Sequence, residues 1–182
     1  LYHHDGDKAS ARAAEKFGTF YSMSTMATSS IEEIANVSSG PKIFQLYIHK
    51  DQSLTDNLID RCKNSGFKAL CLTVDTVVAG NRERDHKWGF TTPPKLTLKS
   101  FLNFAMHPKW SLNYLTHEKF QLANVSHFTK KGSSIAKGVM EYINEQYDPA
   151  MSWKDAEYCI KRWGGPFALK GVMSVEDAKK AV

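Results

Sequence analysis

The sequence predicts an α/β fold in which strands and helices alternate around a parallel sheet. Segments rich in β-branched and aromatic residues alternate with segments of helical period along the chain. One of them, residues 68–74 (KALCLTV), is a nearly continuous apolar run, which is expected of a strand buried on both faces. The composition, 42% hydrophobic and 24% charged, is that of a folded globular chain and excludes a disordered one.

The first part of the chain follows this alternation. Residues 7–17 are Ala-rich and amphipathic and predict a helix, and residues 19–23 predict a short apolar strand. Ser29 or Ser30 is placed to cap a second helix that runs through Val37. The elements predicted next are a strand at residues 42–48, a helix at 53–64 and a strand at 68–74.

After the third strand we expect a long irregular region, then a helix at 152–163, a strand at 166–170 and a helix from Ser174 onward. Four strands are half of those in a (β/α)8 barrel, which takes roughly 250 residues. The fold is therefore either part of such a barrel with an insertion or an open doubly wound sheet. Because the chain opens with Leu1 and stops at Val182 inside a predicted helix, we expect part of a domain.

The composition also bears on membrane spans and metal sites. No run of about 18 apolar residues is present, so no transmembrane helix is predicted. Cys62, Cys71 and Cys159 are odd in number and widely spaced, and their spacing fits no zinc pattern. We therefore predict no metal site and expect reduced thiols in a cytoplasmic protein.

Polar side chains recur near the carboxyl ends of the predicted strands, the end that forms the active site in barrel enzymes. Ser24, Gln45, Thr73 and Lys170 lie at the ends of four different strands. Any one of them can be a cap or a satisfied core group. Polar residues at the carboxyl ends of four strands together indicate a site for a mostly apolar ligand with several polar ring edges.

Four short motifs, in this order and spacing, resemble the FMN-dependent 2-hydroxy-acid oxidases and dehydrogenases. The motifs are residues 24–33 (STMATSSIEE), 44–47 (FQLY), 72–75 (LTVD) and 169–171 (LKG). Residues 106–110 (MHPKW) and 148–155 (DPAMSWKD) are similar to the bacterial L-lactate dehydrogenase branch. The resemblance implies a partial (β/α)8 barrel, strands two to five, over residues 1–182, with an insertion at 87–147.

The resemblance implies that FMN is the cofactor and assigns roles to the residues at the strand ends. Ser24, Gln45 and Thr73 would hydrogen-bond the polar edge and linking atoms of the flavin. Lys170 would lie near flavin N1 and O2, where a fixed ammonium stabilises the negative charge of the reduced ring. From the residues alone, Thr73 is equally an ordinary strand threonine.

Catalytic and substrate-binding roles are also implied. Tyr47 would donate its hydroxyl to the substrate, and Arg82 would bind the substrate carboxylate as a bidentate fork. Asp75 would orient and stabilise an imidazolium, and it completes the implied catalytic set with Tyr47 and Lys170. By spacing alone, Arg82 can instead pair with a neighbouring acid on a solvated turn, and Asp75 can cap a turn.

The implied activity is oxidation of an L-2-hydroxy acid, with L-lactate converted to pyruvate. Electrons would pass to a quinone or cytochrome in a dehydrogenase, or to oxygen in an oxidase. The family's histidine base follows the sixth strand and matches no histidine here, so this chain alone is expected to be inactive. Met26 stands where oxidases often carry tryptophan, which leaves the preferred acid open. The resemblance also implies a homo-oligomer.

The insertion is strongly basic and rich in aromatic residues. Residues 87–137 contain eight lysines and one acid, a local charge of +7 in a chain of net charge +5. The resemblance implies peripheral contact of this segment with the inner face of the cell membrane. A solvated loop that packs its aromatics on the barrel is the competing interpretation, and no nucleic-acid-binding module is recognisable. A second functional hypothesis is a non-catalytic βα scaffold that binds a membrane or a partner through this loop.

Overall fold

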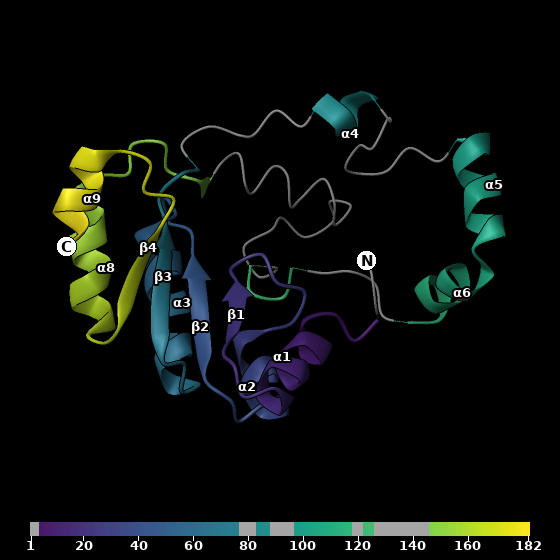
Figure 1. Ribbon diagram of the computed structural model, residues 1–182, viewed down its shortest axis with the longest axis horizontal. Helices are drawn as coiled ribbons and strands as arrows, with labels where there is room; N and C mark the ends of the chain where they lie inside the picture. Colours follow the sequence, from purple (N-terminus) through teal and green to yellow (C-terminus); the bar gives the residue numbers. More distant parts are fainter. Residues whose placement is uncertain (1–3, 77–82, 88–96, 118–121, 126–145) are drawn as a thin grey trace.

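The computed structural model describes residues 4–76, 83–87, 97–117, 122–125 and 146–182. In this part of the chain, four parallel strands form one sheet, and their order in the sheet is their order in the sequence (Figure 1). The strands are β1 (Tyr21–Ser24), β2 (Lys42–Leu46), β3 (Ala69–Thr73) and β4 (Phe167–Lys170). The predicted α/β fold with four βα units is confirmed.

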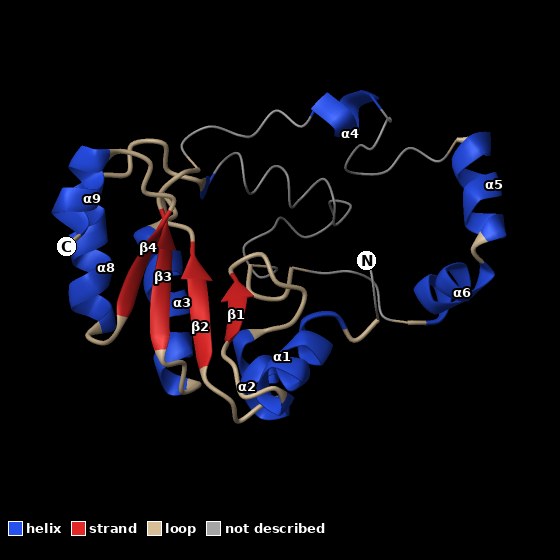
Figure 2. Ribbon diagram, in the orientation of Figure 1, coloured by secondary structure: helices blue, strands red, loops and turns tan. Residues whose placement is uncertain are grey.

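Helices alternate with the strands, and all but the last contribute buried residues to one core. They are α1 (Gly6–Lys16), α2 (Ile31–Val37), α3 (Gln52–Asn64), α8 (Trp153–Trp163) and α9 (Val175–Ala181). Figure 2 shows α3 behind the sheet, and α3 contacts α2 on one flank and α8 on the other. A doubly wound sheet reverses its strand order at a switch point. The sequential order here is that of a barrel segment instead, so the open-sheet alternative is wrong.

Alternate strand residues give the sheet one apolar face and one polar face. The apolar face carries residues with no exposed surface: Met23, Phe44, Leu46, Leu70 and Leu72. The opposite face carries Ser22, Ile43 and Ala69 toward the amino ends of the strands and small or polar residues toward the carboxyl ends: Ser24, Gln45, Cys71, Thr73, Ala168 and Lys170. The hydrophobic core therefore lies between the sheet and its helices.

The helix starts follow the predicted caps. Ser30, rather than Ser29, caps α2, because its hydroxyl accepts from the Glu33 amide while the Glu33 carboxylate accepts from the Ser30 amide. Ser152 begins α8 with the same type of capping box, and Ser174 caps α9. The boundaries of the predicted helices and strands agree with the structure to within about two residues.

The prediction of a long irregular region after β3 is wrong for its described part. Three helices lie there: α4 (Glu83–Lys87), α5 (Leu98–Met106) and α6 (Pro108–Thr116). Apolar residues at positions 98, 101, 102 and 106 have the helical period, which the mixed basic and aromatic composition of this region obscures.

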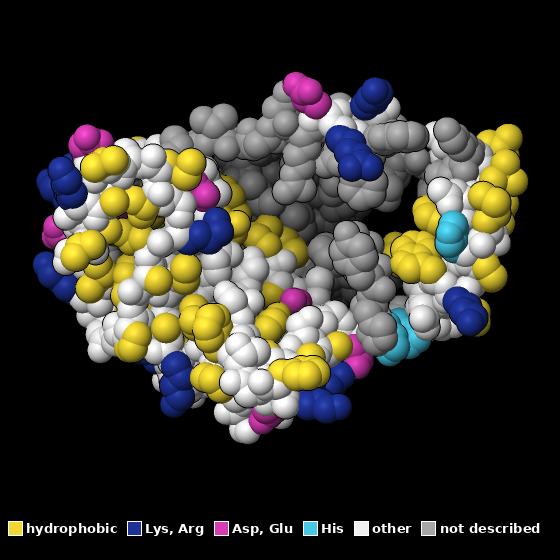
Figure 3. All heavy atoms as spheres, in the orientation of Figure 1, with side chains coloured by type: hydrophobic (Ala, Val, Ile, Leu, Met, Phe, Trp, Pro, Cys, Tyr) yellow, Lys and Arg dark blue, Asp and Glu magenta, His cyan; other side chains and the backbone are white. Residues whose placement is uncertain are grey.

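α5 and α6 pack against each other and turn apolar side chains outward. Trp110 stacks between Phe104 and Tyr114, with ring centroids 5.4 and 5.2 Å apart. Leu98 is 78% exposed and Phe101 is 67% exposed. Figure 3 shows the hydrophobic side chains of this pair gathered at the right edge of the molecule. None of the helices that the structure describes is long and apolar enough to cross a membrane.

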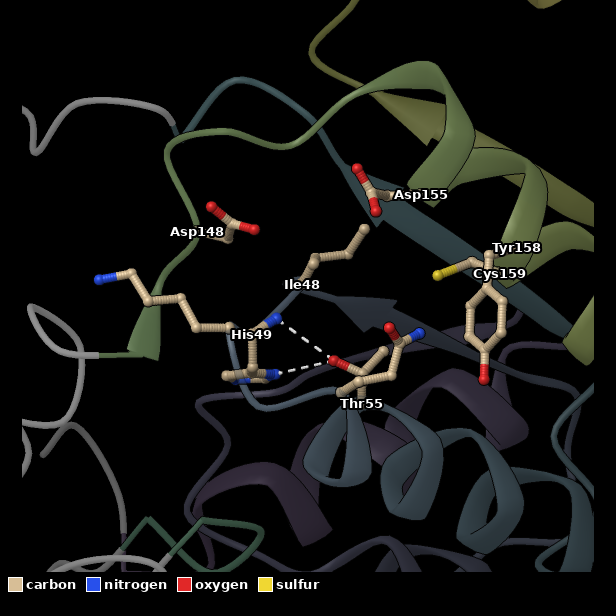
Figure 4. Close-up of a pocket in the computed structure, with 9 residues that line it drawn as sticks. Ile48, His49, Thr55, Asp148, Asp155, Tyr158 and Cys159 are labelled. Atoms are coloured by element: carbon tan, nitrogen blue, oxygen red, sulfur yellow. Dashed lines mark hydrogen bonds between the residues drawn. The ribbon is translucent and has the colours of Figure 1, made fainter.

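His49 follows β2, forms an isolated antiparallel bridge with Tyr147 and is buried, with 3% of its surface exposed. Its amide donates to Thr55 Oγ1 (3.2 Å), and its ring Nδ1 lies 3.5 Å from the same oxygen. Figure 4 shows the imidazole beside Thr55 in a small polar pocket between the end of β2 and α8. Burial lowers the pKa of His49 to about 4, although the Asp51 carboxylate opposes this effect.

We expect His49 to make the fold acid-sensitive between pH 6.5 and about 4. In this range the unfolded chain binds a proton at position 49 and the folded chain does not, so the free energy of unfolding falls as the pH falls. The loss reaches at most about 3 kcal/mol. The measurement is thermal unfolding of the full-length protein and its His49→Gln variant at several pH values, with His107→Gln as an exposed control. An identical pH slope in wild type and His49→Gln would contradict this assignment.

Candidate functional site

A row of hydrogen bonds joins the carboxyl ends of β1, β2 and β3 on the polar face. Ser24 Oγ donates to Gln45 Oε1 (3.1 Å), and Gln45 Nε2 donates to Thr73 Oγ1. The first contact follows from the register, which places Ser24 beside Gln45. Ser24 and Gln45 are half-buried and Thr73 is buried. The structure therefore brings these three predicted site residues together.

A charged pair lies at the end of this row. Lys170 is the register partner of Thr73, and its ammonium lies 3.4 Å from Asp75 Oδ2. Both side chains are partly exposed, so the ion pair contributes little stability. Gly171 allows the close approach: its φ is +99°, and a Cβ there would lie 2.5 Å from Asp75 Cγ.

Tyr47 follows β2 and packs its half-buried ring against Tyr147, with the ring centroids 5.0 Å apart. Tyr147 comes from the far end of the predicted insertion, and the bond from the Lys50 amide to the Gln146 carbonyl (2.7 Å) holds that segment beside β2. Arg82 lies outside the described residues, so its contact with a substrate carboxylate stays a prediction.

Three residues that the sequence analysis did not single out support this end of the sheet. The buried Thr25 hydroxyl donates to the Gln45 carbonyl (2.8 Å) and accepts from the Tyr47 amide (3.3 Å). Asp7 and Asn124 both hydrogen-bond the loop after β1. No local sequence pattern predicts the contacts of Asp7 and Asn124, because their hydrogen-bond partners lie far along the chain.

The arrangement suits a planar ligand with a polar edge. Hydroxyl groups and an amide offer both donors and acceptors along one line, and an ammonium lies at its end. The neighbouring Cys71 and Ala168 on the same face have small side chains.

Comparison with known proteins gives a consistent result. The family model described as FMN-dependent dehydrogenase matches residues 1–182. Glycolate oxidase 1 of Oryza sativa subsp. indica is 39% identical over 182 residues, which are 100% of this chain and 43% of that protein. An L-lactate dehydrogenase of Allorhizobium ampelinum is 36% identical over 183 residues, or 48% of its length.

A solved structure agrees with the fold as well. The crystal structure of (S)-mandelate dehydrogenase, described as a monotopic membrane protein, superposes with a TM-score of 0.88 at 32% identity, covering 97% of this chain and 46% of that one. The chain thus spans less than half the length of these relatives. The similar identities to glycolate oxidase and L-lactate dehydrogenase do not separate the predicted lactate dehydrogenase branch from the others.

We expect Gly171→Ala to destabilise the protein more than Gly66→Ala. Both glycines have positive φ, so each substitution incurs backbone strain of roughly 1–2 kcal/mol. At Gly66 the new methyl group would enter open space, whereas at Gly171 it would collide with Asp75 and add about 1–3 kcal/mol. Urea unfolding of the two full-length variants measures the difference. Equal losses would show that Asp75 moves aside freely.

Proposed function

The chain belongs to the FMN-dependent dehydrogenase family, and on this premise we propose that the full-length protein oxidises an L-2-hydroxy acid, with L-lactate as substrate and pyruvate as product. The observation behind this proposal is the row formed by Ser24, Gln45 and Thr73, with Lys170 at its end. This row offers the hydrogen-bonding groups and the positive charge that suit the polar edge of a flavin.

The residues at the strand ends fit FMN. The polar edge of the flavin ring carries both carbonyl acceptors and N–H donors, and the hydroxyls and the amide of the row match either type. Their mutual hydrogen bonds fix the orientation of the Gln45 amide before a ligand binds. When bound, FMN supplies the acceptor for the two electrons that leave the α-carbon of the acid.

The side chains around the row have distinct roles in this proposal. Lys170 places a positive charge where negative charge develops at the ring edge. Asp75 holds that ammonium and offers a carboxylate to a histidine cation. Tyr47, braced by Tyr147, donates its hydroxyl to the substrate, and Arg82 binds the substrate carboxylate.

The electron acceptor is proposed to be a quinone or cytochrome, with oxygen as the alternative. A membrane-bound acceptor agrees with the exposed apolar surface of α5 and α6, where Leu98, Phe101, Leu102 and Leu115 are each more than half exposed. The surrounding segment 87–137 carries a charge of +7, which would attract anionic lipid headgroups. We therefore propose that this helical pair rests on the inner face of the cell membrane.

The first test of the activity is a visible spectrum of the full-length protein. We expect a yellow protein that bleaches on anaerobic addition of L-lactate. Lys170→Met should slow bleaching about 10²- to 10³-fold, because it removes the charge that stabilises the reduced state. Lys68→Met, an exposed lysine before β3, is the matched control and should leave the rate unchanged.

Other outcomes of this experiment discriminate among the alternatives. Bleaching by glycolate or (S)-mandelate but not L-lactate would keep the reaction class and replace the substrate. A folded, colourless full-length protein that cannot take up FMN would contradict the proposal and support the non-catalytic scaffold.

Membrane contact has a separate test. We expect the full-length protein to sediment with vesicles that contain anionic lipid, and the double variant Phe101→Ser/Leu102→Ser to lose at least about tenfold in affinity, because less apolar area is buried. Phe17→Ser is the control, since Phe17 directly follows α1, is 82% exposed and lies outside this helical pair. Unchanged binding of the double variant would rule out this surface.

A further inference from the structure

The loop between β1 and α2, residues 25–30, connects the proposed cofactor residues to the helix layer. Ser24 precedes the loop, and Met26 lies within it at the position where the substrate preference is in question. The Met26 amide donates to Ser24 Oγ (3.1 Å), and the Ala27 amide donates to the Ser24 carbonyl (3.0 Å). These two bonds couple the start of this loop to the first residue of the hydrogen-bonded row.

Asp7 in the first turn of α1 holds this loop. Its Oδ2 accepts from the amide and the hydroxyl of Thr28, both at 2.7 Å, and from the Ser29 amide at 3.3 Å. Its Oδ1 accepts from the Tyr21 hydroxyl at 2.9 Å. The contact is close, since a Cβ at Gly6 would lie 3.0 Å from Thr28 Oγ1. Burial raises the pKa of Asp7, but the hydrogen bonds from Thr28 and Tyr21 outweigh this and keep it ionised.

Asn124 also holds this loop. Its side chain is fully buried, its Nδ2 donates to the Ser29 carbonyl (3.3 Å), and its Oδ1 accepts from the Ile31 amide (3.0 Å). Asn124 therefore also caps the start of α2. Asp7 contacts the loop without contacting that helix terminus, so it is the cleaner residue for an experiment.

We infer that Asp7 is a positioning residue, which fixes residues 25–30 through Thr28 and Ser29 and thereby sets Ser24 and Met26 at the cofactor and substrate site. The inference rests on the proposed function for the identity of the two ligands. A purely structural residue would stabilise α1 alone. As a positioning residue, Asp7 is predicted to affect the loop as well, so that the loop shifts when the Asp7 side chain is removed. A displacement of about 1 Å at such a site can lower catalysis 10²-fold.

The same helix supplies a matched control. Near its other end, Glu15 accepts from the amide and the hydroxyl of Ser39, in the segment that leads into β2. Glu15 thus ties α1 to the sheet as Asp7 does, but at the amino ends of the strands. Glu15→Ala removes the two bonds from Ser39 without touching the β1–α2 loop.

The experiment compares full-length wild type with Asp7→Ala, Asp7→Asn and Glu15→Ala. FMN is titrated into each apoprotein by flavin fluorescence, and amide hydrogen exchange is followed at Thr28 and Ser29. We expect Asp7→Ala to speed exchange at these amides at least tenfold, weaken FMN binding about tenfold and lower kcat/KM by 10- to 100-fold at saturating FMN. Asp7→Asn keeps an acceptor oxygen for Thr28 and should recover most of each loss. Glu15→Ala should stay within about twofold of wild type in all three.

The outcomes separate this inference from the proposed function. Wild type that binds no FMN would overturn the proposed function, whatever the exchange data show. If wild type binds FMN but Asp7→Ala leaves exchange at Thr28 and Ser29 unchanged, Asp7 does not hold the loop. Faster exchange with unchanged FMN affinity and kcat/KM would make Asp7 a structural residue only. Should Asp7→Ala fail to fold, Thr28→Val removes one of the same bonds and must show the same pattern on a smaller scale.

Discussion

Successive side chains of a strand point to opposite faces of a sheet, and the rest of this structure depends on that alternation. Once Phe44 and Leu70 pack beneath the helices, Gln45 and Cys71 must face the other way. A register slip of one residue would bury the polar row and expose the core, so the core packing itself holds the row in place. The alternation of side chains along the strands therefore determines both the stability of the sheet and the position of the residues proposed to bind the cofactor.

The sequence was sufficient to predict the features that depend on local pattern. Residues 68–74 identified β3 because a strand in the middle of a parallel sheet needs an apolar run. Ser29 and Ser30 were both possible caps, so the start of α2 was predicted to within one residue, and the structure selects Ser30. Ser24, Gln45, Thr73 and Lys170 could be grouped because parallel strands bring their carboxyl ends to one edge.

The parts that could not be predicted depend on contacts between distant segments. Asp7 looked like an ordinary acid in the first turn of a helix, where the helix dipole alone accounts for its presence. Thr25 is one of several threonines and serines in its stretch, and its two bonds to β2 appear only when the strands are paired. In residues 87–147, aromatic and basic residues interrupt the helical period, so the sequence did not predict the helices α5 and α6.

Asn124 ties the segment 87–147 to the loop after β1, so this segment is not structurally independent of the rest of the chain. Thr116 ends α6, and six residues later Leu122 is buried in the core beside α2, so the helical pair is tethered within about 20 Å of that anchor. A chimera that exchanged the whole of residues 87–147 with a relative would strip the Ile31 amide and the Ser29 carbonyl of their partner. A graft that replaces only α5 and α6, with junctions at residues 97 and 117, would keep Asn124 and its two contacts with the loop after β1.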